Sequence, residues 1–292
     1  MKPDLTVIIL TYNEELHIER CINRVNDIAK KIYVVDSFSE DSTKTIAEEN
    51  GAEVVEHSWP GNQAEQFNWA LDNLPIKSEW VLRLDADEYL LPELKEEISE
   101  RLPKLETDIN GIIFKRRHYF LGEWVKRGTY PVHILRLFRY GKATYEPRWM
   151  DEHLHLLEGR TIEFEYDFVD HNLRSLGWWT EKHNHYSIRE AAEYFDWKYG
   201  ILGSSRGRKP FTKQKEAYYK KPLFWRAFLY FLYRYVLKLG FLEGKEGFLW
   251  HFLQGWWYRT LVDAKILEIK RACGDDPQTI KDYIKKEYGL DL

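Results

Sequence analysis

Three carboxylates follow a short apolar run in the first third of the chain. Asp85, Asp87 and Glu88 come after the run 80–82 and the pair Arg83-Leu84. If the apolar run forms a buried strand, Asp85 and Asp87 share one face at its end, because side chains alternate along an extended chain. Carboxylate oxygens suit Mg²⁺ or Mn²⁺, and a cation held by only two side chains keeps positions open for phosphate oxygens. The alternative for so short a motif is a solvated acidic turn.

Two earlier apolar runs also lead into polar residues. Residues 5–10 and 31–36 are rich in β-branched side chains and too short for helices, and helical spacing follows each of them. A further strand at 79–84 ends in the acidic cluster. Alternating strands and helices predict a doubly wound, mainly parallel α/β sheet, whose ligands bind beyond the carboxyl ends of the strands. The candidate nucleotide-binding residues at those ends are Thr11, Asn13, Glu14, Asp36, Arg83 and Asp85.

Asp36 has two interpretations. At the end of the second strand its carboxylate would accept hydrogen bonds from a uracil or ribose edge, with Asn13 or Thr11 contributing from the loop above. Alternatively, Asp36 and Ser37 cap the turn that follows. The sequence leaves both roles open.

Composition limits the class of protein. With 292 residues, 44% of them hydrophobic, the chain can form one main core plus an elaboration. The 43 Lys and Arg against 47 Asp and Glu give a net charge of −4, which argues against nucleic acid as a partner. Cys21 and Cys273 are too few for a disulfide framework, and no signal-peptide pattern follows Met1. We therefore expect a cytoplasmic protein.

The second half of the chain changes in character. Strand-like runs at 111–114 and 134–138 flank an aromatic and basic stretch, and residues 204–210 look like a linker. Beyond it, apolar helices carry the cations Arg226, Arg234, Lys238 and Arg259, and the first uninterrupted run is shorter than the ~20 residues that span a bilayer. Two arrangements remain open: peripheral attachment at an anionic membrane surface on the inner face of the cell membrane, or internal packing of the rings.

The strand-end motifs resemble a known family. Thr11-Tyr12-Asn13-Glu14-Glu15, Val35-Asp36-Ser37 and Arg83-Leu84-Asp85-Ala86-Asp87-Glu88 are similar to the signatures of family 2 inverting glycosyltransferases. Trp149-Met150-Asp151-Glu152-His153-Leu154 and the stretch 240–244 are most similar to the bacterial subgroup that adds single sugars to lipopolysaccharide inner core or related cell-surface glycans.

The resemblance implies a GT-A fold and a UDP-sugar or other nucleotide-diphosphate sugar as donor. It implies Mn²⁺ or Mg²⁺ at Asp85 and Asp87, and it suggests that His171 reaches the metal or diphosphate, although a lone histidine is more often structural. We expect a catalytic domain over 1–205, with nucleotide-sugar binding in 1–105 and the acceptor side in 106–205. Residues 206–292 then form a helical C-terminal extension.

Inverting transfer needs one more carboxylate. A base opposite the leaving group must take the proton from the acceptor hydroxyl. Glu152 is our choice and Asp151 the alternative, because in an extended segment the two side chains point to opposite sides. The predicted function is transfer of a single sugar to a glycan or lipid-linked saccharide. The alternative is a catalytically silent carbohydrate- or nucleotide-sugar-binding protein of the same fold.

Overall fold

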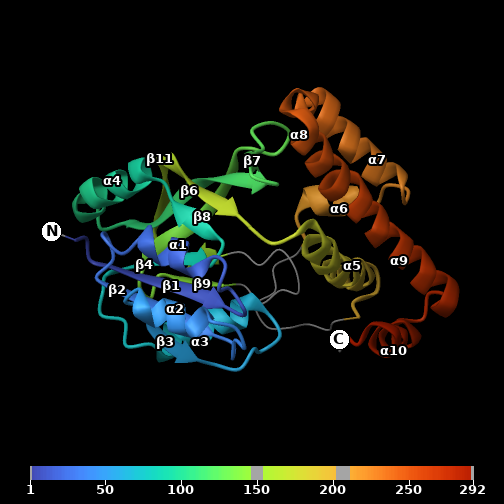
Figure 1. Ribbon diagram of the computed structural model, residues 1–292. Coiled ribbons are helices and arrows are strands. Elements are labelled where there is room, and N and C mark those ends of the chain that lie inside the picture. Colours follow the sequence, from blue (N-terminus) through green and yellow to red (C-terminus); the bar gives the residue numbers. More distant parts are fainter. Residues whose placement is uncertain (1, 146–153, 202–210, 291–292) are drawn as a thin grey trace. The chain divides into compact units, whose positions relative to one another are not determined.

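The computed structural model describes residues 2–145, 154–201 and 211–290. Contacts divide the chain into two compact units, one formed by the described residues up to 173 and the other by those from 174 onward (Figure 1). The first unit is built on a sheet, whereas the described part of the second has helices but no strand.

The first unit holds a nine-stranded sheet in the order β3-β2-β1-β4-β8-β6-β11-β5, with β7 paired to β6. Its parallel part consists of β1 (Leu5–Thr11), β2 (Lys31–Asp36), β3 (Glu53–Glu56) and β4 (Trp80–Asp85). These strands alternate with α1 (Ile18–Asn23), α2 (Thr43–Glu49) and α3 (Gln63–Asn73). The predicted α/β class is confirmed.

The remaining strands make the sheet mixed. They are β5 (Glu88–Leu90), β6 (Ile109–Phe120), β7 (Glu123–Trp124), β8 (Val132–Arg139) and β11 (Arg160–His171). Strand β8 runs antiparallel to β4 and β6, whereas β6 and β11 are parallel. Helix α4 (Pro92–Arg101) and the short turn η1 (Leu102–Lys104) connect β5 to β6, and β9 (Ala143–Tyr145) pairs with β10 (Leu154–Leu156) separately.

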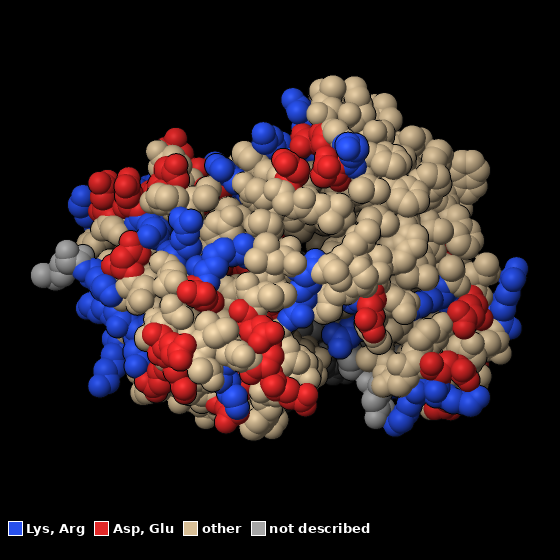
Figure 2. Space-filling view, in the orientation of Figure 1, with Lys and Arg blue, Asp and Glu red and all other residues tan. Residues whose placement is uncertain are grey.

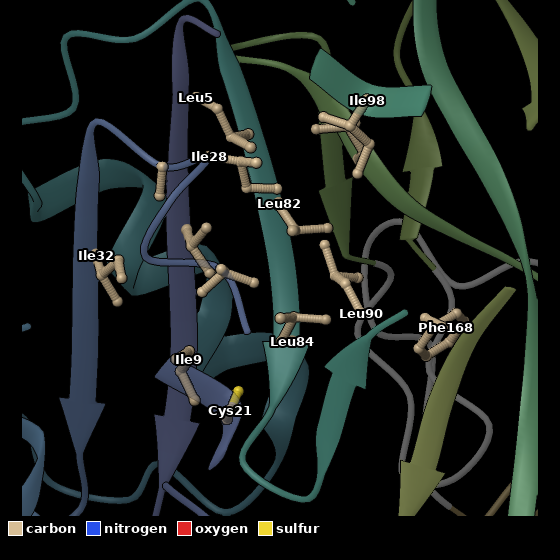
Figure 3. Close-up of a cluster of buried hydrophobic side chains, with 14 of the residues drawn as sticks. Leu5, Ile9, Cys21, Ile28, Ile32, Leu82, Leu84, Leu90, Ile98 and Phe168 are labelled. Atoms are coloured by element: carbon tan, nitrogen blue, oxygen red, sulfur yellow. The ribbon is translucent and has the colours of Figure 1, made fainter. Parts of the chain in front are cut away.

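Both faces of the parallel part are buried, which explains why its strands are continuous apolar runs. On β1, Leu5 and Ile9 pack into a cluster with Cys21 of α1 and Leu82 of β4 (Figure 3). Ile8, pointing to the opposite face, packs with residues of α3. The register places Thr11 beside Asp36 and Leu10 beside Asp85. The carboxyl ends of β1, β2 and β4 therefore meet at one edge.

The second unit is a bundle around α5 (Leu176–Tyr199), α9 (Tyr258–Cys273) and α10 (Pro277–Tyr288). Its other elements are α6 (Lys213–Tyr219), α7 (Trp225–Leu232), η2 (Tyr233–Leu237), η3 (Gly240–Glu243), α8 (Gly244–Trp250) and η4 (His251–Trp257). Phe195 of α5 is buried with Ile266 and Ile280. Compact packing therefore divides the chain before α5, whereas the predicted functional boundary lies after it, at 205. Among the described helices, none is long and apolar enough to cross a membrane.

Two of the C-terminal arginines follow the internal one of the two arrangements left open for these helices. The side chains of Arg226 and Arg234 are buried and do not face a membrane surface. Arg226 Nε donates to Asp263 Oδ1 at 2.8 Å, and Arg234 donates to Gln254. Arg259 lies 3.7 Å from Glu190. Arg226 of α7, Arg234 of η2 and Arg259 of α9 are therefore paired with carboxylate and amide side chains of other helices.

This packing predicts the effect of removing Asp263. Asp263→Ala should destabilise the helical unit by about 3–5 kcal/mol, because it leaves the buried Arg226 guanidinium without its carboxylate. Urea denaturation followed by tryptophan fluorescence measures the change. Asp282→Ala removes an exposed carboxylate of α10 and is the control. Equal midpoints for the two variants would contradict a stabilising role for the buried pair.

Candidate active site

The loops after β1 and β2 are fixed to one another by side chains at the strand ends. Asp36 is fully buried, and its carboxylate accepts from Thr11 Oγ1 at 2.8 Å and from Ser39 N and Oγ, both at 2.6 Å. This is the capping arrangement, not contact with a ligand. The nucleotide-binding role of Asp36 stays a prediction.

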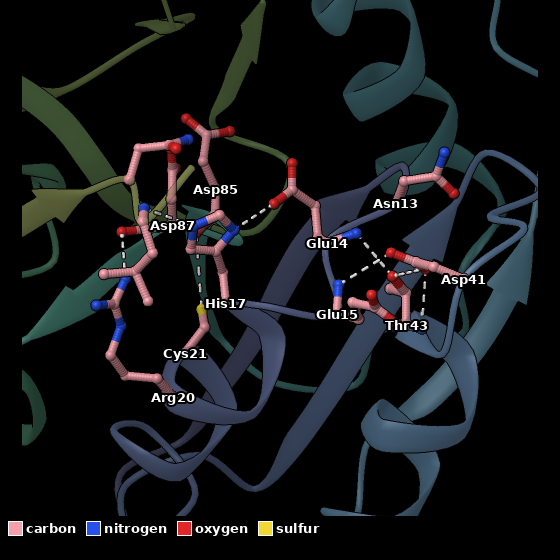
Figure 4. Close-up of polar contacts among 12 residues, drawn as sticks. Asn13, Glu14, Glu15, His17, Arg20, Cys21, Asp41, Thr43, Asp85 and Asp87 are labelled. Atoms are coloured by element: carbon pink, nitrogen blue, oxygen red, sulfur yellow. Dashed lines mark hydrogen bonds and ion pairs between the residues drawn. The ribbon is translucent and has the colours of Figure 1, made fainter. Parts of the chain in front are cut away.

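Asn13 and Glu14 extend this connection. The backbone N–H of Asn13 donates to Ser39 Oγ at 2.7 Å, and Asn13 Oδ1 accepts from Glu40 N at 2.8 Å. Glu14 N donates to Thr43 Oγ1 at 2.7 Å (Figure 4). Asn13 adopts a φ of 56°, a left-handed conformation that asparagine tolerates better than most residues. The predicted positions after β1 therefore lie together at the strand edge and shape the loop through backbone contacts.

His17 is a site residue that sequence analysis missed. Its ring is fully buried, and Nδ1 lies 2.6 Å from Glu14 Oε2 (Figure 4). Nε2 accepts from the backbone N–H of Leu173 at 2.9 Å. A backbone N–H can only donate, so the proton of the neutral ring sits on Nδ1 and is donated to Glu14. His17 thereby links the loop after β1 to the chain after β11.

Two arginines hold the first carboxylate of the acidic motif. Arg83 Nη2 lies 2.7 Å from Asp85 Oδ1, and Arg136 Nη2 lies 3.3 Å from Asp85 Oδ2. Arg136 also pairs with Glu88, which accepts from the backbone N–H of Asp85 at 3.0 Å. Burial raises the pKa of Glu88 to about 7, although the Arg136 guanidinium opposes this rise. The turn between β4 and β5 is thus fixed by an internal ion-pair network.

Arg136 was not predicted as a site residue, and Glu88 was named only as the third carboxylate of the acidic motif. The available signal was a charged residue inside the apolar run Ile134-Leu135-Arg136-Leu137-Phe138. A charge in a buried strand requires a partner of opposite sign. The partner itself could not be found from spacing, because it lies on another strand.

The second carboxylate, Asp87, faces the end of β11. Its Oδ2 accepts from Asn172 Nδ2 at 2.9 Å, and its backbone carbonyl accepts from His171 N at 3.0 Å. Arg20 of α1 donates to the carbonyl of His171 at 2.6 Å, and its Nη1 lies 3.4 Å from His171 Nδ1. Burial lowers the pKa of His171, and the Arg20 charge adds to that effect. The structure therefore brings His171 beside Asp87.

The donor set fits a divalent cation in part. Asp85 and Asp87 supply hard oxygen ligands from one strand end, and phosphate oxygens and water would complete the coordination. Among the described residues, however, no three His, Cys, Asp or Glu side chains are grouped as a metal site. Asp85, Asp87 and His171 are neighbours, not a ready three-ligand set. A cation at Asp85 would share that carboxylate with Arg83 and Arg136.

The two candidates for the catalytic base are not placed. Asp151 and Glu152 lie outside the described residues. Their roles stay predictions.

Comparisons with known proteins agree with the strand-end motifs. Residues 6–161 match the model of glycosyl transferase family 2. An uncharacterized glycosyltransferase of Rickettsia bellii is 43% identical over 94 residues, which cover 32% of this chain and 31% of that protein. The glycosyltransferase SunS of Bacillus phage SPbeta is 32% identical over 108 residues, covering 36% of this chain and 25% of SunS. The matches thus span about a third or less of the length of these curated relatives.

A slight likeness to solved structures also exists. The crystal structure of glucosyl-3-phosphoglycerate synthase from Mycobacterium tuberculosis with Mn²⁺, UDP and glucosyl-3-phosphoglycerate is 22% identical, with a TM-score of 0.31. The likeness covers 39% of this chain and 44% of that one, and is too slight to carry an argument.

The family model covers more than half of the chain, and the matched residues include the ends of β1, β2 and β4 that form the candidate site. The chain therefore belongs to glycosyl transferase family 2.

Proposed function

We propose that the protein moves a single sugar, with inversion at its C1 carbon, from a nucleotide-diphosphate sugar to a hydroxyl of a cell-surface glycan or lipid-linked saccharide. A UDP-sugar is the donor that we favour. The observation that carries the proposal is the placement of Asp85 and Asp87 at the end of a central strand, beside the ends of β1 and β2. In α/β sheets, nucleotides bind at such an edge.

The chain's own residues would orient the donor. Arg83 and Arg136 fix the Asp85 carboxylate, and Asn172 and the backbone of His171 fix Asp87, so neither carboxylate has to be ordered when the donor arrives. A bound Mn²⁺ or Mg²⁺ would supply positive charge to the leaving diphosphate. The base, Glu152 in our proposal, would take the proton of the acceptor hydroxyl as the new bond forms at C1 and the bond to the phosphate oxygen breaks.

Metal dependence is the first test. Asp87→Asn should lower sugar transfer by roughly 100-fold or more, because the cation loses one of two protein ligands. Transfer and donor hydrolysis are measured with a panel of UDP-sugars and Mn²⁺. Asp72→Asn, an exposed carboxylate of α3, is the matched control. Full activity in excess chelator would refute the metal role, and donor binding without turnover by the unmodified protein would favour the silent binding protein.

The base is tested separately. Glu152→Gln should lower turnover by about 10²–10⁴-fold while donor affinity stays nearly unchanged, because a positioned base acts on the acceptor and not on the nucleotide. Asp151→Asn is the matched variant. If Asp151→Asn shows that loss while Glu152→Gln keeps normal turnover, the two roles are exchanged. If neither matters, the base lies elsewhere.

We also propose that an exposed apolar face of the helical unit docks on an anionic membrane. This face consists of Trp225, Leu229, Tyr233, Val236, Leu237, Leu239, Phe241, Leu242 and Phe248, whose exposed fractions lie between 42% and 73%. Spacing by four residues along α7 and η2 makes part of it a stripe, and the Tyr235 ring contacts Phe241 and Phe248. In Figure 2 the α7 side of the unit shows few charged side chains, whereas red and blue side chains are visible near α8.

The charges beside this face suit anionic lipid. Lys220, Lys221, Lys238 and Lys245 are exposed around it, whereas Glu243 and Glu246 are partly buried. Apolar insertion and attraction of lysines to anionic headgroups act together at membrane surfaces. Such docking would bring the enzyme to a lipid-linked acceptor. The exposed lysines, and not the buried arginines, would contact the anionic headgroups.

Vesicle flotation measures this docking. The protein should float with vesicles containing phosphatidylglycerol, and Leu237→Ser with Trp225→Ser should abolish flotation, because the insertion loses its two most exposed side chains. Leu157→Ser, an exposed leucine of the first unit, is the control. Absence of flotation at low salt would refute membrane docking. So would a dimer in solution that the same double substitution dissociates, because the apolar face would then be a subunit interface.

A further inference from the structure

A row of neighbouring residues, joined by backbone pairing and ring contacts, leads from the acidic motif to a basic cluster on β6. His171, which donates its backbone N–H to the Asp87 carbonyl, stacks on Tyr119 with ring centroids 4.9 Å apart. Tyr119 pairs with Trp124 across β6 and β7. The Trp124 ring lies under the Arg117 guanidinium, 4.2 Å from its centroid. The basic cluster is therefore continuous with the candidate donor site within the first unit.

This Arg117 cluster consists of Lys115, Arg117, Trp124, Lys126, Tyr130 and Asp167. Asp167 is buried, and its Oδ2 accepts hydrogen bonds from Arg117 Nε at 2.6 Å and from Tyr130 Oη at 2.9 Å. Lys115 Nζ lies 3.8 Å from Asp167 Oδ1. Lys126 Nζ lies 5.2 Å from the Trp124 centroid. Two cations, Arg117 and Lys115, thus contact one buried carboxylate, and Lys126 adds a third positive charge at the Trp124 ring. In Figure 2, Lys and Arg side chains gather around α1 and the strands beside it.

The orientation of Arg117 shows which donors remain for a ligand. Its Nε is bound by Asp167 and its plane is held over Trp124. Neither of its terminal Nη groups has a hydrogen-bond acceptor among the described residues, and 29% of the side chain is exposed. Such a fixed guanidinium fork matches the two oxygens of a phosphate or carboxylate, and ordering it in advance lowers the cost of binding.

We infer that the acceptor sugar carries a negative group, a phosphate or a carboxylate, which binds to the Arg117 cluster while the acceptor hydroxyl faces the donor. The inference rests on the proposed transfer reaction and names the class of its acceptor. Tyr119, between the cluster and Asp87, and Trp124 within the cluster provide ring surface along which a saccharide extends. Arg117 is a specificity residue: it selects the acceptor and takes no part in bond making.

Calorimetry on the full chain tests the inference with the donor site filled by saturating UDP and Mn²⁺. The probes are glucose, glucose 6-phosphate and glucuronate, which present no anion, a phosphate and a carboxylate. At least one anionic sugar should bind about tenfold more tightly than glucose, because charge-assisted hydrogen bonds to a fixed guanidinium are stronger than neutral ones. The anionic probe that binds more tightly shows whether the negative group is a phosphate or a carboxylate. Higher salt should reduce the preference.

Substitutions locate the effect. Arg117→Gln should remove the roughly tenfold preference, Arg117→Lys should restore part of it, and the exposed Lys126→Gln should weaken it without risk to folding. Lys44→Gln, at a partly exposed lysine of α2, is the matched control and should leave the sugar preference unchanged. UDP affinity should be the same in all four variants.

The outcomes separate the two proposals. Two results would overturn the inference of an anionic acceptor: equal binding of glucose and both anionic sugars, or a preference that survives both Arg117→Gln and Lys126→Gln. UDP binding in the same experiment would still support the proposed donor site. Failure to bind any UDP-sugar or UDP, with the Arg117-dependent preference intact, would overturn the proposed donor and leave the anion site standing.

Discussion

A buried guanidinium between two carboxylates organises the candidate site. Arg136 and Glu88 are both buried, and removing Arg136 would leave the Glu88 carboxylate without its ion-pair partner at a cost of several kcal/mol. Because Arg136 also reaches Asp85, and because Glu88 accepts the Asp85 backbone N–H, the same network fixes where the β4–β5 turn places its carboxylates. The position of Asp87, two residues further, follows from that turn.

Other contacts at the edge extend this constraint to distant parts of the chain. His17 joins the loop after β1 to Leu173, and Arg20 of α1 donates to the carbonyl of His171. The strand that carries His171 pairs with β6, so the acidic motif, the end of β11 and the Arg117 cluster belong to one connected arrangement in the first unit. Donor and acceptor functions can therefore share a framework that is ordered before either ligand binds.

Local sequence patterns predicted the helices and strands well, but they predicted few of the side-chain contacts. The apolar runs of β1, β2 and β4, each buried on both faces, were identified because burial leaves a continuous signature. Asp36 and Arg226 show the limit: the sequence left two roles open for each, and their partners Thr11 and Asp263 are 25 and 37 residues away. No sequence pattern indicates the role of His17, because its two hydrogen-bond partners are 3 and 156 residues away.

The central claim is that Asp85 and Asp87, held by this network, bind the cation of a nucleotide-sugar site. Anomalous diffraction at the manganese edge, from crystals grown with UDP and Mn²⁺, tests it most directly. The account predicts one anomalous peak contacting carboxylate oxygens of both Asp85 and Asp87, with UDP phosphate oxygens on its other side. Bound UDP with Asp85 still held by Arg83 and Arg136, and no manganese beside Asp87, would contradict it.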